Sequence, residues 1–354
     1  TGQGLTPGAH PPKPCHDLPD LLCAGSPAHC GELVPFEPVA GPGYRNDPEN
    51  GETWDDQYRS YLRRDLRQLV KYATAKVACL TADWETWPFE PLGLIDMSEA
   101  DGSIPGSSVG YPGHPPGTHE DGKDIDLAYY QLFAPDNAPR VIGDHYDGDG
   151  YEQWHLMAPP PALDVWRTAL LIASLTEHPR LRVVGVDGQA GPLIEYAFDV
   201  LVDGEWIDAE LRDRIPLAYE IVDEGRGWFL FHHHHLHVSL LPLADIVDEV
   251  DLDPDVLNTK STGKTITAYL ELKAGYDVED VNRIALMLDG HTLLPALEAP
   301  RTVGDHDKDG VPDLMVKFDR QTVAGALSSG EVEVSLTGMV GPLHFQGTDT
   351  ITVK

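Results

Sequence analysis

The sequence predicts an α+β domain with a small antiparallel sheet and flanking helices, followed by a C-terminal β-sandwich domain of the Ig-like kind. Two observations carry this prediction. Up to about residue 243, helical periodicities are mixed with short strand-like runs, which is typical of an α+β domain. Beyond that residue, short β-rich runs separated by turn signals dominate, at the spacing of a small sandwich.

The chain of 354 residues is long enough for two cores, and three parts are predicted. Residues 1–50 are rich in Pro and Gly and are expected to form an irregular arm anchored by disulfides. Residues 51–243 form the α+β domain, and residues 244–354 form the β-sandwich. An acidic stretch over residues 245–255 is interpreted as the linker between these two domains.

Apolar spacing places the elements of each domain. The predicted helices cover residues 54–80, residues 163–176 and stretches between 193 and 224. In the same domain, the predicted strands cover residues 124–132, 181–186, 227–231 and 235–241. In the second domain, the predicted strands cover residues 264–272, 281–288, 314–318, 332–336 and 348–353.

The charge of the chain argues against two classes of partner. There are 58 Asp and Glu residues against 25 Lys and Arg residues, which gives a formal net charge of -33. A surface of this sign repels nucleic acid and anionic lipid, so we expect neither as a partner. No apolar run approaches the length of a membrane span, and we expect no such span.

Four cysteines, Cys15, Cys23, Cys30 and Cys79, indicate an oxidising compartment. Three of them lie in the Pro-rich N-terminal stretch, which has little else to hold it, and the fourth lies in the first predicted helix. We expect two disulfides, and hence a secreted, periplasmic or extracellular protein, while the sequence leaves the pairing open. A zinc knot of the four thiolates is disfavoured because no Cys-x-x-Cys spacing occurs.

A first candidate metal motif begins at His119 and ends at Asp126. Gly122 permits a tight turn after the histidine, and the chain then enters a predicted strand. Asp124 and Asp126 lie on one face of that strand because its side chains alternate, whereas Ile125 faces the core. A loop histidine and a strand carboxylate are thus expected to meet at one metal ion.

A second candidate motif lies far downstream, in the histidine-rich run over residues 232–237. An expression tag would also contain consecutive histidines, but this run is internal and continues directly into an amphipathic strand. His235, His237 and Ser239 lie on one face of that strand, while its aliphatic residues lie on the other. The strand therefore directs two histidines to the same side.

Two histidines and one aspartate suit a catalytic zinc site, because three protein ligands leave one position open for water. Zinc lowers the pKa of that water toward ~7 and polarises the carbonyl group that is hydrolysed. Each ligating histidine also needs an acceptor for its second ring nitrogen, and Asp124 is the candidate for that supporting role. A metal-storage or metal-sensing patch is the alternative interpretation of the clustered histidines.

The two motifs resemble those of the penicillin-insensitive murein endopeptidases and of the wider superfamily of lysostaphin-type enzymes, D-alanyl-D-alanine peptidases and the hedgehog signalling domain. The Ser/Thr-His-x-x-Gly-x-x-x-Asp core of this superfamily is matched by Thr118, His119, Gly122 and Asp126. The His-x-x-His-x-His pattern of the endopeptidases is matched by His232, His235 and His237. The resemblance covers roughly residues 55–242 in order and spacing.

This resemblance implies a zinc peptidase that hydrolyses peptide bonds, with peptidoglycan cross-links as the expected substrate. It implies that the zinc ligands are His119, Asp126 and His237. It also implies that His232 occupies the place of the catalytic glutamate of carboxypeptidase relatives. By the same resemblance, His235 lines the site beside the metal and stabilises the developing oxyanion or transfers a proton.

The chain departs from the endopeptidase pattern three residues before the first ligand, where that pattern has a histidine. This chain has Pro116 there, with His114 nearby on a Pro-rich loop. One alternative is a D-Ala-D-Ala-type carboxypeptidase, which needs a cation for the terminal carboxylate of its substrate. The candidates for that cation are Arg59, Arg63, Arg64 and Arg67. The other alternative is a catalytically inactive, zinc-containing binding module, against which the proton-handling histidines argue.

Residues 305–313 of the second domain resemble a calcium-binding loop. Its first, third, fifth and ninth positions are occupied by Asp305, Asp307, Asp309 and Asp313, with Gly310 at the sixth. Val316 stands where a full EF-hand has a bidentate glutamate, and strands rather than helices flank the loop. We expect a structural Ca2+ at this turn, and a solvated acidic turn is the alternative. A related acidic run over residues 143–152 has a different spacing.

Overall fold

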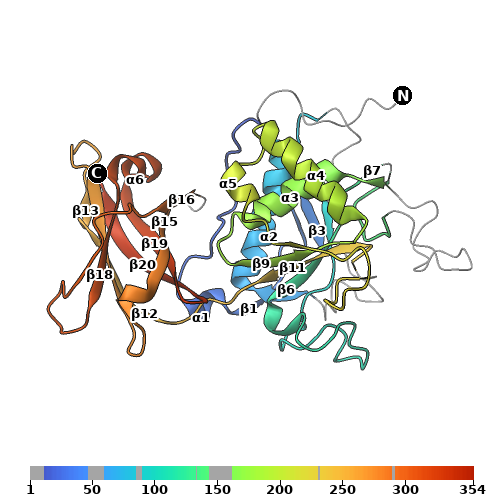
Figure 1. Ribbon diagram of the computed structural model, residues 1–354, viewed down its shortest axis with the longest axis horizontal. Coiled ribbons are helices and arrows are strands. Elements are labelled where there is room, and N and C mark those ends of the chain that lie inside the picture. The colour runs from blue at the N-terminus through green and yellow to red at the C-terminus, as the bar shows by residue number, and fades with distance from the viewer. Residues whose placement is uncertain are drawn as a thin grey trace, which may run out of the picture. The chain divides into compact units, whose positions relative to one another are not determined.

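The computed structural model describes residues 12–46, 60–84, 90–132, 134–142, 162–229, 232–288 and 292–354. The chain divides into two compact units, each of which is made of two separate stretches (Figure 1). The first unit consists of Thr1–Leu21 and Leu33–Leu241, and the second consists of Leu22–Glu32 and Pro242–Lys354. Helices and several sheets occur together, as an α+β fold requires.

The first unit is built on a mixed sheet. In the part of the chain that the structure describes, this sheet has seven strands in the order β10-β9-β11-β6-β5-β3-β2. Its strands are β2 (Ala40–Gly41), β3 (Tyr44–Asn46), β5 (Leu92–Leu94), β6 (Asp124–Ala128), β9 (Leu181–Gly185), β10 (Leu217–Ala218) and β11 (His235–Leu240). The central strands β9, β11, β6 and β5 pair antiparallel, whereas β10 joins β9 and β3 joins β5 in parallel. The expected antiparallel sheet is therefore the centre of a larger, mixed one.

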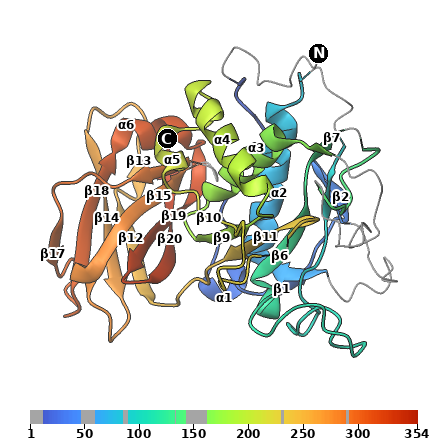
Figure 2. The same ribbon diagram turned by 45° about the vertical axis from the view of Figure 1, so that its right-hand side comes forward.

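Two short strand pairs accompany the sheet. They are β1 (Leu33–Pro35) with β4 (Tyr61–Arg63), and β7 (Gln131–Leu132) with β8 (Ala162–Leu163). Helices pack beside the sheet (Figure 2), namely α2 (Arg64–Leu80), α3 (Val165–Thr176), α4 (Ala190–Asp203) and α5 (Ala209–Arg212). α2 packs against α3, and α3 packs against α4.

Local chemistry explains where these helices begin and how they are fixed. Asp164 caps α3 by accepting a hydrogen bond from the backbone nitrogen of Arg167 at 3.2 Å. α2 is tied to the residues before β9 by a buried ion pair, in which Arg180 Nη2 lies 2.6 Å from Asp65 Oδ2. Separating the two charges would leave each of them buried without a partner, which is unfavourable. The ion pair therefore fixes the helix relative to the sheet.

Most elements predicted for this unit are confirmed, with shifted ends. The predicted helix over 54–80 begins at Arg64 in the structure because β4 precedes it, and residues 54–59 lie outside the described ranges. The strand predicted over 124–132 is split into β6 and β7. The strand predicted over 227–231 is wrong in its described residues 227–229, which belong to a loop.

In the second unit, two sheets contribute to one hydrophobic core. Among the described residues, their strand orders are β12-β14-β18-β17 and β13-β20-β19-β15-β16. Their strands are β12 (Val247–Asp253), β13 (Val256–Leu257), β14 (Thr265–Leu272), β15 (Val281–Leu288), β16 (Thr292–Pro295), β17 (Thr302–Gly304), β18 (Asp313–Asp319), β19 (Gly330–Val340) and β20 (Leu343–Val353); α6 (Arg320–Ala326) follows β18. Leu270 and Phe318 of the first sheet and Leu286 and Leu336 of the second are fully buried in this core.

The interpretation of residues 245–255 as an acidic linker is wrong. Most of this stretch is β12, which pairs antiparallel with β14. Val250 and Leu252 are buried in the core, while Asp248, Glu249 and Asp253 on either side of them are exposed. The stretch is a half-buried strand whose acidic outer face conceals the alternation of its apolar residues.

The described part of the predicted N-terminal arm is divided between the two units. β1, β2 and β3 belong to the first unit, while α1 (Pro27–Cys30) belongs to the second. In the second unit, Gln346 Nε2 of β20 donates a hydrogen bond to the backbone oxygen of Cys23 at 2.8 Å. Two disulfides are formed, Cys15–Cys79 in the first unit and Cys23–Cys30 in the second.

Within the described ranges, no helix has the length and apolar character needed to cross a membrane.

Loss of the Cys15–Cys79 disulfide is expected to destabilise the protein more than loss of Cys23–Cys30. The two bridges join residues separated by 64 and 7 positions. Because a longer closed loop removes more conformational entropy from the unfolded chain, we expect losses of about 4 and about 2 kcal/mol. Denaturant unfolding of the two double Cys→Ser variants measures this difference, and equal losses would contradict it.

Candidate metal centre

The two predicted motifs meet where β6 pairs with β11. The register places His237 opposite Asp126, Ser239 opposite Asp124 and His235 opposite Ala128. Directly opposite residues of an antiparallel pair project from the same face of the sheet. The carboxylates of β6 and the imidazoles of β11 therefore share one face, as the alternation of both strands predicts.

His119 reaches this face from the turn that precedes β6. Its backbone is left-handed, with a φ of 55°, and a short 3-10 turn, Glu120–Gly122, follows it. Gly122 is also left-handed, and a Cβ at this position would lie 2.6 Å from the backbone nitrogen of Arg63. Only glycine suits that position. The turn is held by the backbone nitrogen of His119, which donates to Oδ2 of Asp124 at 2.8 Å.

Asp126 is the centre of the site. It is 1% exposed, and four imidazoles of the described residues lie around its carboxylate. Oδ1 lies 3.1 Å from His237 Nδ1 and 3.3 Å from His119 Nε2. Oδ2 lies 3.5 Å from His235 Nε2 and 3.7 Å from His114 Nε2. Burial raises the pKa of this carboxyl, but the neighbouring imidazoles outweigh burial and hold the pKa well below its usual range.

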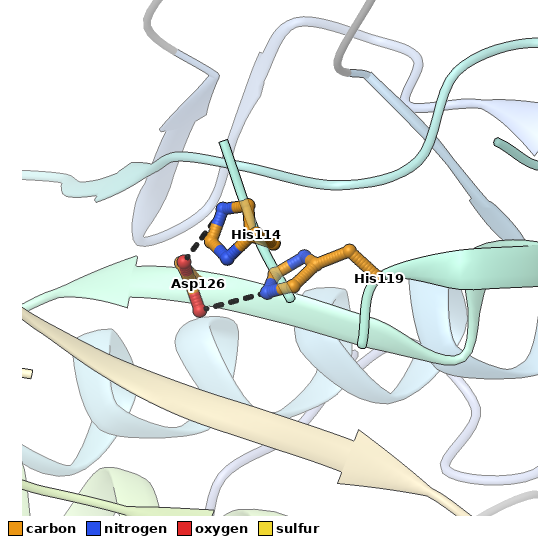
Figure 3. Close-up of side chains that lie close together, drawn as sticks. All are labelled: His114, His119 and Asp126. Carbon is orange, nitrogen blue, oxygen red and sulfur yellow. Dashed lines mark ion pairs between the residues drawn. The ribbon is translucent and has the colours of Figure 1, made fainter. Parts of the chain in front are cut away.

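His114 belongs to the site although the predicted ligand set does not include it. His114, His119 and Asp126 form a group whose ligand atoms all lie within 4.8 Å of one another, so this group could hold a metal ion (Figure 3). The rings of the two histidines lie 3.9 Å apart, centroid to centroid. Nε2 of His114 also lies 2.8 Å from Oδ2 of Asp96, in a hydrogen bond. Sequence reasoning noted His114 near the motif but gave it no role, and it missed Asp96 entirely.

His237, the third predicted ligand, is not part of that group, although it lies beside Asp126. Its Nδ1 faces Asp126, while its Nε2 lies 3.6 Å from Oδ1 of Asp124. A ligating histidine commonly directs its second ring nitrogen to a carboxylate in this way. Burial lowers the pKa of His237, but Asp124 and Asp126 outweigh burial and raise the pKa to about 9. Asp124 thus lies beside His237, and its supporting role stays a prediction.

The donor atoms fit a cation chemically. His119 is fully buried, and neither of its ring nitrogens has a hydrogen-bond partner of normal geometry among the described residues. Buried polar atoms without a partner are rare in proteins, and a metal ion would satisfy one of these nitrogens. Imidazole and carboxylate groups are typical ligands of zinc.

His232 and His235 border the same cluster. The ring centroid of His232 lies 5.1 Å from that of His235 and 5.9 Å from that of His237. The Tyr129 hydroxyl donates to the backbone oxygen of His232 at 2.8 Å and helps to hold this residue in a left-handed conformation. Burial lowers the pKa of His232 to about 4 and that of His235 well below its usual value. Both rings are therefore neutral at neutral pH.

The sequence offers four arginines for binding the carboxylate of a carboxypeptidase substrate. Arg67 Nη1 donates to the backbone oxygen of Pro35 at 3.0 Å, and Arg59 lies outside the described ranges, as does the acidic run over 143–152. A different arginine, Arg182, is close to the site. Its Nε donates to Ser239 Oγ at 2.9 Å, and its Nη2 lies 3.9 Å from Asp124 Oδ1. Sequence reasoning missed it because its strand carries no motif.

The calcium-like turn lies between β17 and β18. The carboxylate oxygens of Asp305, Asp307 and Asp313 lie within 4.8 Å of one another. Asp309 is not part of this group, and its Oδ1 accepts a hydrogen bond from the backbone nitrogen of Val311 at 2.7 Å. A second acidic group shares Asp307 and adds Glu249 of β12 and Glu271 of β14. The sequence does not reveal this second group because its members meet only through strand pairing.

Comparison with known proteins assigns no family to this chain. The chain matches no protein-family model, and a search of curated proteins finds no match.

Asp126→Asn is expected to lower zinc affinity by at least about 100-fold, beyond the effect typical of a residue that only supports a ligand. The reason is that one carboxylate lies at the centre of the histidine cluster. The matched control is Asp121→Asn, the same chemical change at an exposed residue of the preceding turn. Competition with a chromophoric chelator measures the affinity, and elemental analysis measures the zinc content. Full zinc binding by a folded Asp126→Asn protein would contradict the assignment.

Proposed function

We propose that the first unit is a zinc metallopeptidase that hydrolyses peptide bonds, and that it acts as a peptidoglycan (murein) endopeptidase. One observation carries this proposal: a buried carboxylate on β6 is surrounded by histidines from a preceding loop and from β11. The resemblance of both motifs to the murein endopeptidases supports the choice of substrate. The -33 charge of the chain is compatible with a substrate that is neither nucleic acid nor anionic lipid.

The proposed zinc ligands are His119, Asp126 and His237, with Asp124 as the residue that orients the last of them. His114 lies close enough to Asp126 to join this set. Zinc in such a site supplies Lewis acidity, which activates water and polarises the scissile carbonyl. The protein keeps the carboxylate ionised and excludes bulk water from it.

His232 and His235 are the proposed proton-handling groups. Because burial keeps both imidazoles neutral at neutral pH, each ring has one unprotonated nitrogen, which general base catalysis requires. An imidazole that has accepted a proton beside the ionised Asp126 can return it to the leaving amine. Either histidine also lies near enough to the cluster to stabilise a developing oxyanion.

A D-Ala-D-Ala-type carboxypeptidase is the second candidate function, and Arg182 is the observation that favours it. This arginine is half-exposed beside Asp124 and Ser239, and a guanidinium binds a carboxylate well. The ion pair with Asp124 occupies part of its charge, so we rank the endopeptidase first. A catalytically inactive zinc-containing module is the third candidate, and the neutral His232 and His235 argue against it.

Zinc-dependent hydrolysis of purified peptidoglycan tests the proposal. We expect free amines to be released from cross-links, a chelator to stop the release and added zinc to restore it. His232→Ala or His235→Ala is expected to retain zinc while kcat falls by about 100-fold to 10,000-fold, the usual contribution of general acid–base catalysis. Mass spectrometry of the products separates cross-link cleavage from loss of a terminal D-alanine. Binding of peptidoglycan without any product would favour the inactive module.

We further propose that the protein is secreted to a periplasmic or extracellular space, where its two disulfides persist. In this proposal the second unit is an Ig-like β-sandwich, since its two largely antiparallel sheets share one core. A Ca2+ ion at the β17–β18 turn would neutralise the facing oxygens of Asp305, Asp307 and Asp313.

Millimolar Ca2+ is expected to raise the unfolding temperature, because an ion that binds only the folded state stabilises that state. The variant Asp307→Asn should lose most of this rise, since Asp307 belongs to both acidic groups. The control variant is Asp277→Asn, in a turn of the same unit that contains neither group. Calorimetry with Ca2+ and with equal ionic strength of NaCl measures the effect. An equal rise with NaCl would identify simple charge screening.

A further inference from the structure

A buried carboxylate organises the loop that leads from β10 towards His232. Glu220 is 2% exposed, although the loop residues 221–227 that follow it are exposed. Four backbone nitrogens donate to its two oxygens: Glu224 and Arg226 to Oε1, each at 3.0 Å, and Trp228 and Phe229 to Oε2 at 2.7 and 3.1 Å. Hydrogen bonds to a charged acceptor are the stronger kind. One side chain therefore fixes a loop that has little core of its own.

This loop places the indole of Trp228 against the candidate metal centre. The ring centroid lies 5.0 Å from that of His232 and 6.2 Å from that of His237. The ring lies over Gly185 of β9, the register partner of His237. A Cβ on Gly185 would lie 2.0 Å from Cζ3 of the indole, so the missing side chain leaves the room that the ring fills.

We propose that Trp228 forms a wall of the substrate site and binds the aliphatic part of the peptide residue next to the scissile bond. In this proposal Glu220 is a positioning residue that acts through Trp228. The inference rests on the proposed peptidase function. Trp228 is half-buried, so this residue beside the candidate metal centre is not sealed within the core. Aromatic walls beside a few polar groups are typical of sites that bind small ligands.

Steady-state kinetics with a soluble peptide substrate tests this role. We expect Trp228→Ala to raise KM by roughly tenfold, the effect of losing an apolar contact in a pocket, with kcat within about twofold. Trp228→Phe should restore most of the binding. Glu220→Gln keeps the shape of the side chain but loses part of its acceptor capacity, and it should raise KM in the same direction. Glu210→Gln, the same change at an exposed residue of α5, is the control and should leave both constants unchanged.

A second variant displaces the indole of Trp228 by a substitution outside the loop. In Gly185→Ala, the new methyl group occupies the place of the ring, so we expect the KM effect of Trp228→Ala with zinc content unchanged. A normal KM in both Gly185→Ala and Trp228→Ala would refute the proposal that Trp228 forms a wall of the substrate site. Normal KM in Glu220→Gln together with a raised KM in Trp228→Ala would overturn the positioning role.

A readout without substrate separates this inference from the proposed function. Co2+ in the metal site should quench the fluorescence contributed by Trp228, taken as the difference between the protein and Trp228→Phe. We expect Glu220→Gln to recover part of that emission because the indole moves away from the metal. Quenching with no hydrolysis by the unaltered protein would refute the peptidase while leaving Trp228 beside the metal. Equal quenching in the unaltered protein and Glu220→Gln would refute the positioning role whatever the activity.

Discussion

The pairing of β6 with β11, in the register that sets His237 opposite Asp126, is the constraint on which the candidate site depends. A slip of one residue would turn every side chain of a strand to the other face of the sheet. Ile125 and Leu127 of β6 and Leu236 and Val238 of β11 are fully buried between the site-facing residues, so such a slip would turn polar site residues into the apolar core. The apolar core thus fixes the register, and the register brings the carboxylate and the imidazoles together.

Holding this cluster out of water costs the fold stability, and several features offset that cost. A buried carboxylate is unfavourable unless it is paired, and here imidazoles from separate segments pair with Asp126. His119 and His232 both adopt left-handed backbone conformations, which are strained for residues with a side chain. Such strain tends to collect at functional sites, where the surrounding structure holds it. The turn at Gly122 and the Tyr129 hydroxyl supply that support.

Alternation along two strands was enough to predict that Asp124, Asp126 and His237 face one another, because each strand is short and its faces differ sharply. His114 could not be found in this way, since a Pro-rich loop has no periodicity that predicts the direction of its side chains. Asp96 was missed because it lies just beyond β5, in a stretch that carries no motif. Glu220 and Trp228 could not be predicted for a related reason. Glu220 acts on backbone nitrogens, and Trp228 fills the space over Gly185, and neither feature leaves a pattern in the sequence. β12 was mistaken for a linker because its acidic residues outnumber its buried aliphatic ones.

The chain enters the second unit twice, first over Leu22–Glu32 and again from Pro242 onward. Between these stretches the ribosome must complete the whole sheet of the first unit. The segment that holds the Cys23–Cys30 disulfide is therefore made long before its hydrogen-bond partner Gln346, which lies 323 residues further along the chain than Cys23. A single proteolytic cut after Leu241 would likewise leave Leu22–Glu32, which belongs to the second unit, on the fragment that carries the first unit. Maturation of the two units is thus coupled through the order of the chain.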